Sequence, residues 1–293
     1  MASLQTPKIV LLGLPSTGKT SFLAALRHYI EVDTPNKKLI QYDYSENDEY
    51  LTKIYFDWLG CALPTRTPAN AKTYRNIKLF LQHIETEEKL ILDVPDIAGE
   101  TFNQQWESRS WTKLYMSEIE QADGLILFIH SQDVRTPVFL HDIYALTEGE
   151  EEDYISKLEP WSPRKAPTQV VLVELLQFHL EHFHRKPMPV AIVISAWEKL
   201  LSGGTGITPE RWLERNLPLL SQFLIANQEK LQTNVYGVSA QGGDFANTEE
   251  RTKLQHLDDA AERIKVQVGT EHSNDISAPI QWLLNTWQSP STQ

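Results

Sequence analysis

The stretch Gly13-Leu14-Pro15-Ser16-Thr17-Gly18-Lys19-Thr20 decides the fold of this chain. Its spacing, G-x-x-x-x-G-K-[ST], is that of a loop whose backbone N–H groups converge on phosphate oxygens. Lys19 is expected to reach the β- and γ-phosphates of a nucleotide, and the Thr20 hydroxyl to bind Mg²⁺. The nucleotide-binding residues predicted in this region are Gly13, Ser16, Thr17, Gly18, Lys19, Thr20 and Ser21.

The residues on both sides of the loop fit this interpretation. Lys8–Leu12 is a short apolar, β-branched run, which is typical of a buried strand. Ser21–Ile30 carries apolar side chains at helical spacing, and the N-terminus of such a helix adds partial positive charge at a phosphate site. The alternative is a chance match in a glycine-containing turn, which this flanking pattern disfavours.

Further apolar runs indicate the rest of a sheet. Ile77–Ile84 and Lys89–Val94 flank a short polar turn and predict a hairpin. Gly124–Ile129 and Pro189–Ile194 are continuous apolar runs, which are typical of central parallel strands. Val235–Val238 is expected to be the last strand.

Helical patterns alternate with these strands. They cover Tyr50–Leu59, Trp111–Gln121, Val170–Phe183, Arg211–Leu231, Glu249–Val266 and Pro279–Trp287. The alternation predicts an α/β three-layer sandwich, with a mostly parallel sheet that is antiparallel only at the hairpin strand. We expect one domain over residues 1–293, with an insertion at 132–167, a helical insertion at 201–233 and C-terminal helices at 247–293.

Composition narrows the class of protein. Lys and Arg number 27 against 39 Asp and Glu, a net charge of −12, which argues against a broad nucleic-acid surface. No apolar run approaches the roughly 18 residues of a membrane span. The single cysteine, Cys61, cannot form an intramolecular disulfide, and the first strand begins too early for a signal peptide. These features favour a cytoplasmic protein.

A second motif lies at the end of the hairpin. Leu92–Glu100 places Asp96 at a strand end, where its carboxylate would hold Mg²⁺ through a water molecule. Gly99 follows three residues later and lets the backbone approach a γ-phosphate, so that its N–H becomes a sensor of that phosphate.

At this point the chain resembles the translation-factor-related and Ras-like (TRAFAC) class of P-loop GTPases, over about residues 13–242. The third family motif matches Asp96-Ile97-Ala98-Gly99, and the fifth is similar to Val238-Ser239-Ala240-Gln241-Gly242. The resemblance implies a G-domain-like fold that binds GTP or GDP with Mg²⁺, and it gives Ser239 and Ala240 the contact with the guanine O6.

The fourth family motif falls on Ser195-Ala196-Trp197-Glu198, where only the acidic position is kept, as Glu instead of Asp. The resemblance implies that Glu198 accepts hydrogen bonds from the guanine N1–H and amino group. Trp197 either supplies a stacking surface for the base or is an ordinary buried tryptophan at a strand end. Guanine preference is therefore expected, with Trp197 and Glu198 in the predicted site.

Hydrolysis depends on residues that differ from the family pattern. Glu100 stands where Ras-like enzymes hold the water-orienting glutamine; it either acts as a base toward water or points away and leaves hydrolysis slow. For the first switch, Thr65, Thr67 and Thr73 compete, and Thr67 is favoured as the Mg²⁺ ligand. Arg66 would be an internal arginine finger or a solvated loop residue. The predicted catalytic residues are Lys19, Arg66, Thr67 and Glu100, and the metal ligands are Thr20, Thr67 and Asp96.

The resemblance implies a cytosolic GTP-binding switch whose two mobile regions, Pro64–Tyr74 and Ile97–Arg109, contact a protein partner. Trp106 and Trp111 are either interface anchors or core residues. The acidic fourth motif, the Gly99-Glu100 pair and the insertions look like the bacterial double-GTPase-like families of conflict or defence systems. A P-loop ATPase or kinase, and a non-catalytic pseudo-GTPase scaffold, remain alternatives.

Overall fold

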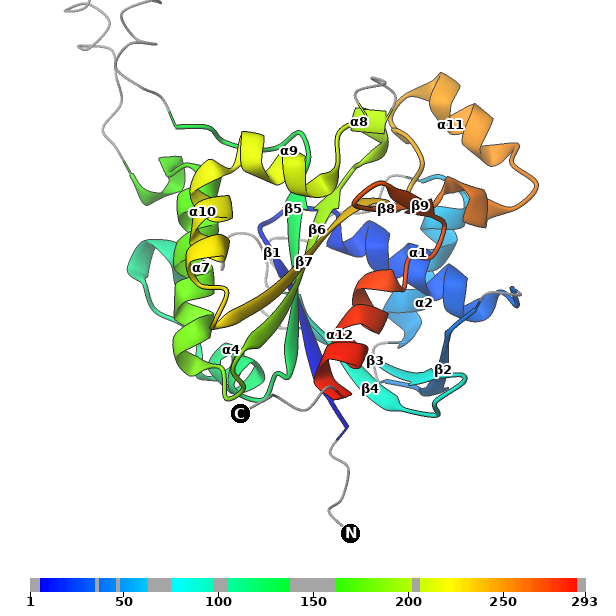
Figure 1. Cartoon of the computed structure of the whole chain (residues 1–293). Helices are drawn as coiled ribbons and strands as arrows, with labels where there is room; N and C mark the ends of the chain where they lie inside the picture. The colour runs from blue at the N-terminus through cyan, green and yellow to red at the C-terminus, as the bar shows by residue number, and fades with distance from the viewer. Residues whose placement is uncertain are drawn as a thin grey trace, which may run out of the picture.

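The structure of the chain is a computed structural model that describes residues 6–34, 37–45, 48–62, 75–96, 105–137, 162–201 and 206–288. Figure 1 shows a central twisted sheet with helices packed on both of its faces. No helix in these ranges is long and apolar enough to cross a membrane.

Within these ranges the sheet has nine strands, in the order β2-β3-β4-β1-β5-β6-β7-β8-β9. Their bounds are β1 Lys8–Gly13, β2 Leu39–Asp43, β3 Arg75–His83, β4 Lys89–Asp96, β5 Gly124–His130, β6 Met188–Ser195, β7 Leu231–Ser239, β8 Lys265–Val268 and β9 Glu271–Ser273. Strands β4, β1, β5, β6 and β7 run parallel to one another. The predicted mostly parallel sheet is confirmed, and so is the antiparallel hairpin of β3 and β4.

Antiparallel pairing goes further than the single hairpin that the sequence indicated. Strand β2 adds to β3 at one edge, and β8 and β9 add to β7 at the other, all antiparallel. The central strands β5 and β6 are buried along nearly their whole length, as their continuous apolar sequence requires when helices cover both faces.

The helices form the two outer layers. Their bounds are α1 Lys19–Glu31, α2 Asp48–Leu59, α4 Lys113–Glu120, α7 Thr168–His182, α8 Glu198–Leu201, α9 Pro209–Asn216, α10 Pro218–Ala226, α11 Thr248–Gln255 and α12 Ala278–Gln288, with short 3₁₀ helices η1 Pro163–Lys165 and η2 Ala260–Arg263. Helices α1, α2 and α12 share one core cluster with one face of the sheet. Helices α4, α7, α9 and α10 share the second cluster with the opposite face.

Two predicted helices are wrong in detail. The helix expected over Arg211–Leu231 is broken at Leu217, because a residue before proline is driven out of the helical region and Pro218 then begins α10. The helix expected over Glu249–Val266 ends at Gln255. Its last part forms η2 and β8, so residues 247–293 hold two strands as well as α11 and α12.

Strand β2 was not predicted. Leu39 is its only fully buried residue, and the other four are exposed or half-buried, so the edge strand has almost no apolar pattern. The predicted insertions at 132–167 and 201–233 stay predictions. Residues 138–161 of the first lie outside the described residues, and the second does contain the helices α9 and α10.

Candidate nucleotide-binding site

The phosphate-binding loop joins β1 to α1 at the centre of the parallel sheet. A side chain at Gly13 would place its Cβ 2.8 Å from the Cβ of Phe128 on the neighbouring strand, so the loop can pass only with glycine there. Gly18 caps α1 in the left-handed conformation, with φ of 82°. Phe22, in the first turn of α1, packs edge-on against Phe128 at a centroid distance of 5.1 Å. The loop is therefore fixed at both ends.

The side chains of the loop brace its own backbone. The Lys19 ammonium donates to the carbonyl oxygens of Gly13 and Leu14, each at 2.8 Å. The Thr17 hydroxyl donates to the Leu14 carbonyl at 2.7 Å, and Thr17 is buried. The Thr17 hydroxyl thus stabilises the loop itself, and the backbone N–H of Thr17 is the group that can bind a phosphate.

A cavity beside the loop brings together three predicted motifs that are far apart in the sequence. The loop and α1 contribute Ser16, Gly18 and Ser21 to its lining. The end of β6 contributes Ser195, the residues after it contribute Ala196 and Glu198, and the segment after β7 contributes Ala240 and Gln241. Because β1, β6 and β7 are parallel, their carboxyl ends meet at one edge of the sheet, where ligands of α/β folds bind.

Glu198 is the most unusual group in this cavity. It begins α8, and its Oε2 atom is buried without a hydrogen-bond partner. Burial raises the pKa of Glu198, and a hydrogen bond from Ser239 opposes that shift. Ser239 is itself fully buried and accepts a hydrogen bond from the Gly242 N–H at 3.0 Å. The site therefore presents an acceptor in need of a donor, beside a braced loop.

Trp197 does not supply a stacking surface, which corrects one of the two alternatives for this residue. Its side chain is completely buried, and its Nε1 donates to Oε1 of Gln267 at 2.8 Å. The ring lies against Gly237, where a Cβ would come within 2.4 Å of it. Trp197 is thus a core residue that anchors the segment carrying Glu198, and it does not line the cavity.

Sequence reasoning missed Trp58, which holds the loop after β7 from the side of α2. Its indole Nε1 donates to the carbonyl oxygen of Ala240 at 2.8 Å. Arg263 in η2 donates to the carbonyl oxygen of Trp58 at 2.9 Å, and its guanidinium lies 5.2 Å from the ring centre. Nothing local in the sequence connects positions that are 182 residues apart.

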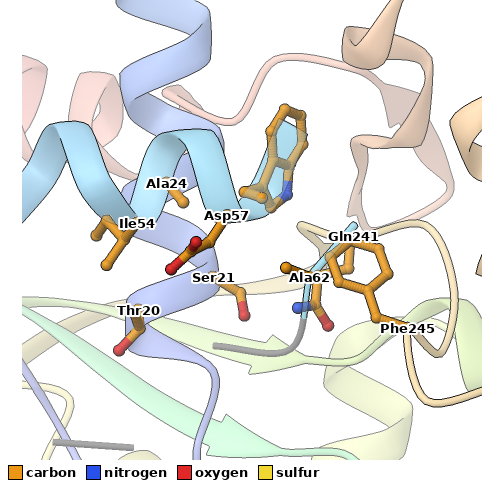
Figure 2. A pocket seen from close by; sticks show the side chains of 9 residues that line it. Thr20, Ser21, Ala24, Ile54, Asp57, Ala62, Gln241 and Phe245 are labelled. Carbon is orange, nitrogen blue, oxygen red and sulfur yellow. The ribbon is translucent and has the colours of Figure 1, made fainter. Parts of the chain in front are cut away.

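A small second cavity lies where α1, α2 and the loop after β7 meet. Figure 2 shows the Asp57 side chain of α2 lying over the first turn of α1, which carries Thr20 and Ser21, with Gln241 across the gap. Ser21 and Gln241 line both this cavity and the one that holds Glu198. Helix α2 therefore lines a cavity that adjoins the one holding Glu198, which the sequence did not indicate.

His130 was also missed, although it ends the central strand β5 beside the loop. It lines the Glu198 cavity and a larger one on the other side of the loop. Its Nδ1 accepts from the backbone N–H of Gln132 and Asp133, at 3.1 and 3.0 Å. Burial lowers the pKa of His130, and an Nδ1 atom that accepts two hydrogen bonds leaves the proton of the neutral ring on Nε2.

The first predicted switch, Pro64–Tyr74, lies wholly outside the described residues, and of the second, Ile97–Arg109, only residues 105–109 are described. Thr65, Arg66, Thr67, Thr73, Gly99 and Glu100 lie outside the described residues. Asp96 ends β4, which pairs with β1 in parallel, so its backbone stands at the same sheet edge as the phosphate-binding loop. Trp106 and Trp111 are both half-buried and line a cavity against α7.

The family model of Double-GTPase 1 matches residues 10–283. A search of the curated proteins gives no match.

Solved structures with a similar course of chain include the bacterial selenocysteine-specific elongation factor EF-Sec, with 12% identity over 85% of this chain and 28% of that one, at a TM-score of 0.39. The signal recognition particle receptor SRb-GTP/SRX complex from Chaetomium thermophilum has 14% identity over 80% of this chain and 91% of that one, at a TM-score of 0.35. A variant of Aquifex aeolicus Era bound to GDP.AlF4⁻ has 14% identity over 87% and 58%, at 0.33. The chain thus spans little more than a quarter of the elongation factor.

The family model covers nearly all of the sheet and both helical layers, and it includes the phosphate-binding loop from Gly13 as well as Glu198 and Ser239. The predicted resemblance to double-GTPase-like proteins is thereby confirmed, and the chain belongs to the Double-GTPase 1 family.

Proposed function

We propose that this chain is a GTP-binding molecular switch that hydrolyses GTP slowly to GDP and phosphate and acts through a protein partner. The observation that carries the guanine part is the buried, unpartnered Oε2 of Glu198 at the cavity beside the phosphate-binding loop. Guanine offers an N1–H and an amino group to such an acceptor, whereas the corresponding edge of adenine has no such donor pair. Membership of a GTPase family supports the same base.

The phosphates would lie in the loop, held by backbone N–H groups and by the Lys19 ammonium. Lys19 would exchange its contacts with the Gly13 and Leu14 carbonyls for phosphate oxygens. The base would lie between Glu198 and the backbone N–H of Ala240, whose carbonyl Trp58 already holds. Ser239 would keep the carboxylate of Glu198 oriented.

Magnesium fits the residues present. The described residues contain no group of three His, Cys, Asp or Glu side chains that could hold a metal, but a nucleotide-bound Mg²⁺ takes most of its ligands from phosphates and water. Thr20 would give its hydroxyl, Asp96 would act through water, and Thr67 is the proposed third ligand. When bound, the ion would offset the negative charge of the phosphates.

Slow hydrolysis is proposed on the chemistry of Glu100, as the sequence presents it. A carboxylate beside a γ-phosphate is unfavourable unless a cation offsets it, so Glu100 is a poorer water-orienting group than glutamine. Loss of the γ-phosphate would release the segments Pro64–Tyr74 and Ile97–Arg109 and change the affinity for a partner. A cytoplasmic place in a bacterial defence system is part of this proposal and rests on the resemblance.

The test is a competition experiment with a fluorescent GTP analogue and the purified full chain. We expect unlabelled GTP to displace the probe at least about tenfold more effectively than ATP, because two hydrogen bonds to a charged acceptor are at stake. Equal displacement by the two nucleotides would favour the ATPase or kinase alternative.

Phosphate release separates a switch from a scaffold. The wild-type chain should release phosphate from GTP, and Lys19→Ala should abolish that release while the protein keeps its fold. Lys165→Ala, an exposed lysine in η1, is the matched control and should behave as the wild type. Equal release from wild type and Lys19→Ala, at the background rate, would support the pseudo-GTPase scaffold instead.

A further inference from the structure

A cavity of about 210 Å³ lies between residues 105–111 and α7. It shares no lining residue with the cavity that holds Glu198, and residues 105–109 are the described end of the second predicted switch. It is lined by Gln105, Trp106, Arg109 and Trp111 on one side and by Glu174, Phe178 and Glu181 of α7 on the other. Its volume is below the 300–1,000 Å³ or so that is usual for a small-molecule pocket. A single amino-acid side chain suits this space better than a nucleotide or cofactor.

Ring stacking and one hydrogen bond hold the aromatic part of the lining in place. Trp111 stacks on Tyr115 and on Phe178, with ring centroids 4.9 and 4.7 Å apart and interplanar angles of 17° and 27°. Trp106 donates its indole N–H to the carbonyl oxygen of Pro163 at 2.8 Å, which fixes the ring to η1. A ligand would therefore meet a prearranged aromatic wall and would lose little affinity to ordering it.

The polar part of the lining includes three acceptors beside the amide group of Gln177. Gln105 is 5% exposed, and its Oε1 is buried without a hydrogen-bond partner. Glu174 and Glu181 add two carboxylates. Arg109 brings a donor to Glu174, with 3.3 Å between Nε and Oε1, but 77% of its side chain is exposed, so it lies at the rim. The buried acceptor of Gln105 is left without a donor.

We propose that this cavity binds the side chain of an arginine on a partner protein. A guanidinium carries five N–H donors in a plane and has no acceptor, so it complements the two carboxylates and the Gln105 oxygen. Its positive charge is attracted both to aromatic rings and to the two carboxylates. Lysine would satisfy the charge but has no planar group to lie along the aromatic wall. The net charge of −12 also favours a basic partner.

The cavity has a physical connection with the nucleotide site through Trp106. The same indole lines the larger cavity beside the phosphate-binding loop, together with Pro15 and His130. A partner arginine that presses on Trp106 therefore touches the wall of that second cavity. Only this consequence, coupling between partner and nucleotide, rests on the proposed switch function; the binding of arginine does not.

The experiment titrates the full chain, without nucleotide, with the peptide acetyl-Gly-Arg-Gly-amide. Its match is the citrulline peptide, which has the same shape but no charge. The indole N–H signals of Trp106 and Trp111, assigned with Trp106→Phe and Trp111→Phe, report the cavity by NMR. We expect saturable shifts of both signals with arginine and an affinity at least about tenfold lower with citrulline.

Three variants sharpen the test. Glu174→Gln should lower the affinity for the arginine peptide several-fold. Glu214→Gln, which changes an exposed carboxylate of α9, should leave this affinity unchanged. Gln105→Leu should also weaken the peptide, yet leave the free energy of unfolding equal or higher, because it removes a buried polar atom that has no partner. A merely structural role of Gln105 would not give this combination.

Two results would overturn the proposal: no saturable shift at Trp106 and Trp111, or equal affinities for the arginine and citrulline peptides. Because no nucleotide is present, a failure of GTP binding in the competition experiment would leave this outcome unaffected. Saturation by arginine in a chain that does not bind GTP would refute the switch and keep the arginine site.

Discussion

Glu198 shows how much one side chain can determine at the residue scale. The Asp expected by the resemblance is one methylene shorter, and the longer Glu reaches the cavity from the first residue of α8. Trp197 stabilises this geometry from behind, because its ring fills the space that the missing side chain of Gly237 leaves. The carboxylate is held by a rigid core and still has one oxygen to offer.

Replacing Glu198 by Gln should change which base is preferred. The amide keeps one acceptor but turns the second oxygen into a donor, which faces the guanine amino group with the wrong polarity. We expect GTP affinity to fall about 10- to 100-fold, and XTP, which has a carbonyl at that position, to gain on GTP. Titration of a fluorescent nucleotide with GTP, XTP and ATP measures this. An unchanged order of the three nucleotides would remove Glu198 from the site.

At the element scale, α2 is the least expected part of the site. It precedes the first predicted switch, and its last turn is fastened to the loop after β7 by Trp58 and to η2 by Arg263. Because α2 also packs along α1, one helix touches the elements that would contact phosphate and base. A displacement of α2 would therefore be felt at both ends of a bound nucleotide.

Removing the indole N–H of Trp58 tests this role. Trp58→Phe keeps an aromatic ring but deletes the hydrogen bond to Ala240, which is worth about 0.5–1.5 kcal/mol. We expect the nucleotide to dissociate several-fold faster. Trp212→Phe, an equally buried tryptophan in the other core cluster, is the control and should change stability only. Equal dissociation rates in the two variants would show that the hydrogen bond between Trp58 and Ala240 does not affect nucleotide binding.

Helix α7 carries a histidine that should make the protein sensitive to acid. His179 is completely buried and shares a 2.9 Å hydrogen bond with the Tyr115 hydroxyl, and burial lowers its pKa to about 3. Above pH 6.5 the ring is neutral in the folded and unfolded chains alike. Below pH 6.5 the ring becomes protonated in the unfolded chain but stays neutral in the folded chain, so the free energy of unfolding falls as the pH drops.

For His179 this loss should amount to about 1.4 kcal/mol per pH unit between pH 6.5 and 3. His179→Gln cannot titrate, and its free energy of unfolding should decline less steeply over this range by about that slope. Denaturant unfolding at several pH values measures it, with the exposed His256→Gln as control. Identical slopes for wild type and His179→Gln would show that the ring is protonated in the folded chain.

At the scale of the whole molecule, the first helix α1 and the last helix α12 pack in the same hydrophobic core. Leu23 of α1 and Leu284 of α12 belong to the same buried cluster, at 2% and 1% exposure. We expect Leu23→Ala and Leu284→Ala each to lower the free energy of unfolding by about 2–5 kcal/mol within one transition. Coincident curves from tryptophan fluorescence and circular dichroism would show one domain. Two separate unfolding transitions, only one of them shifted by Leu284→Ala, would show that the chain forms two domains.

The parts of the molecule that sequence reasoning predicted are those determined by local spacing. Gly13 to Thr20 specify a turn within eight residues, and the apolar runs of β5 and β6 need no partner to be recognised. The end of the long predicted helix at Leu217 was within reach too, because Pro218 was visible in the sequence.

Contacts between distant residues could not be predicted in this way. Trp58 has an apolar helical neighbourhood, and only the folded chain brings its indole to Ala240. Val266 in the short strand β8 follows a helical pattern, but pairing with Val238 of β7 outweighs that weak preference. Trp197 had two equal interpretations until the depth of its burial decided between them.

The two outer strands of the sheet bear on how the protein behaves in concentrated solution. An open sheet invites other chains to add themselves along its borders, and fibrous aggregates grow in that manner. Here one border is the three-residue β9, with all of its residues exposed and polar, and the other is β2, whose pairing with β3 is interrupted between Gln41 and Asp43. The short length and charge of β9 and the irregular hydrogen bonding of β2 leave few groups with which another chain could pair, so the borders of the sheet resist aggregation.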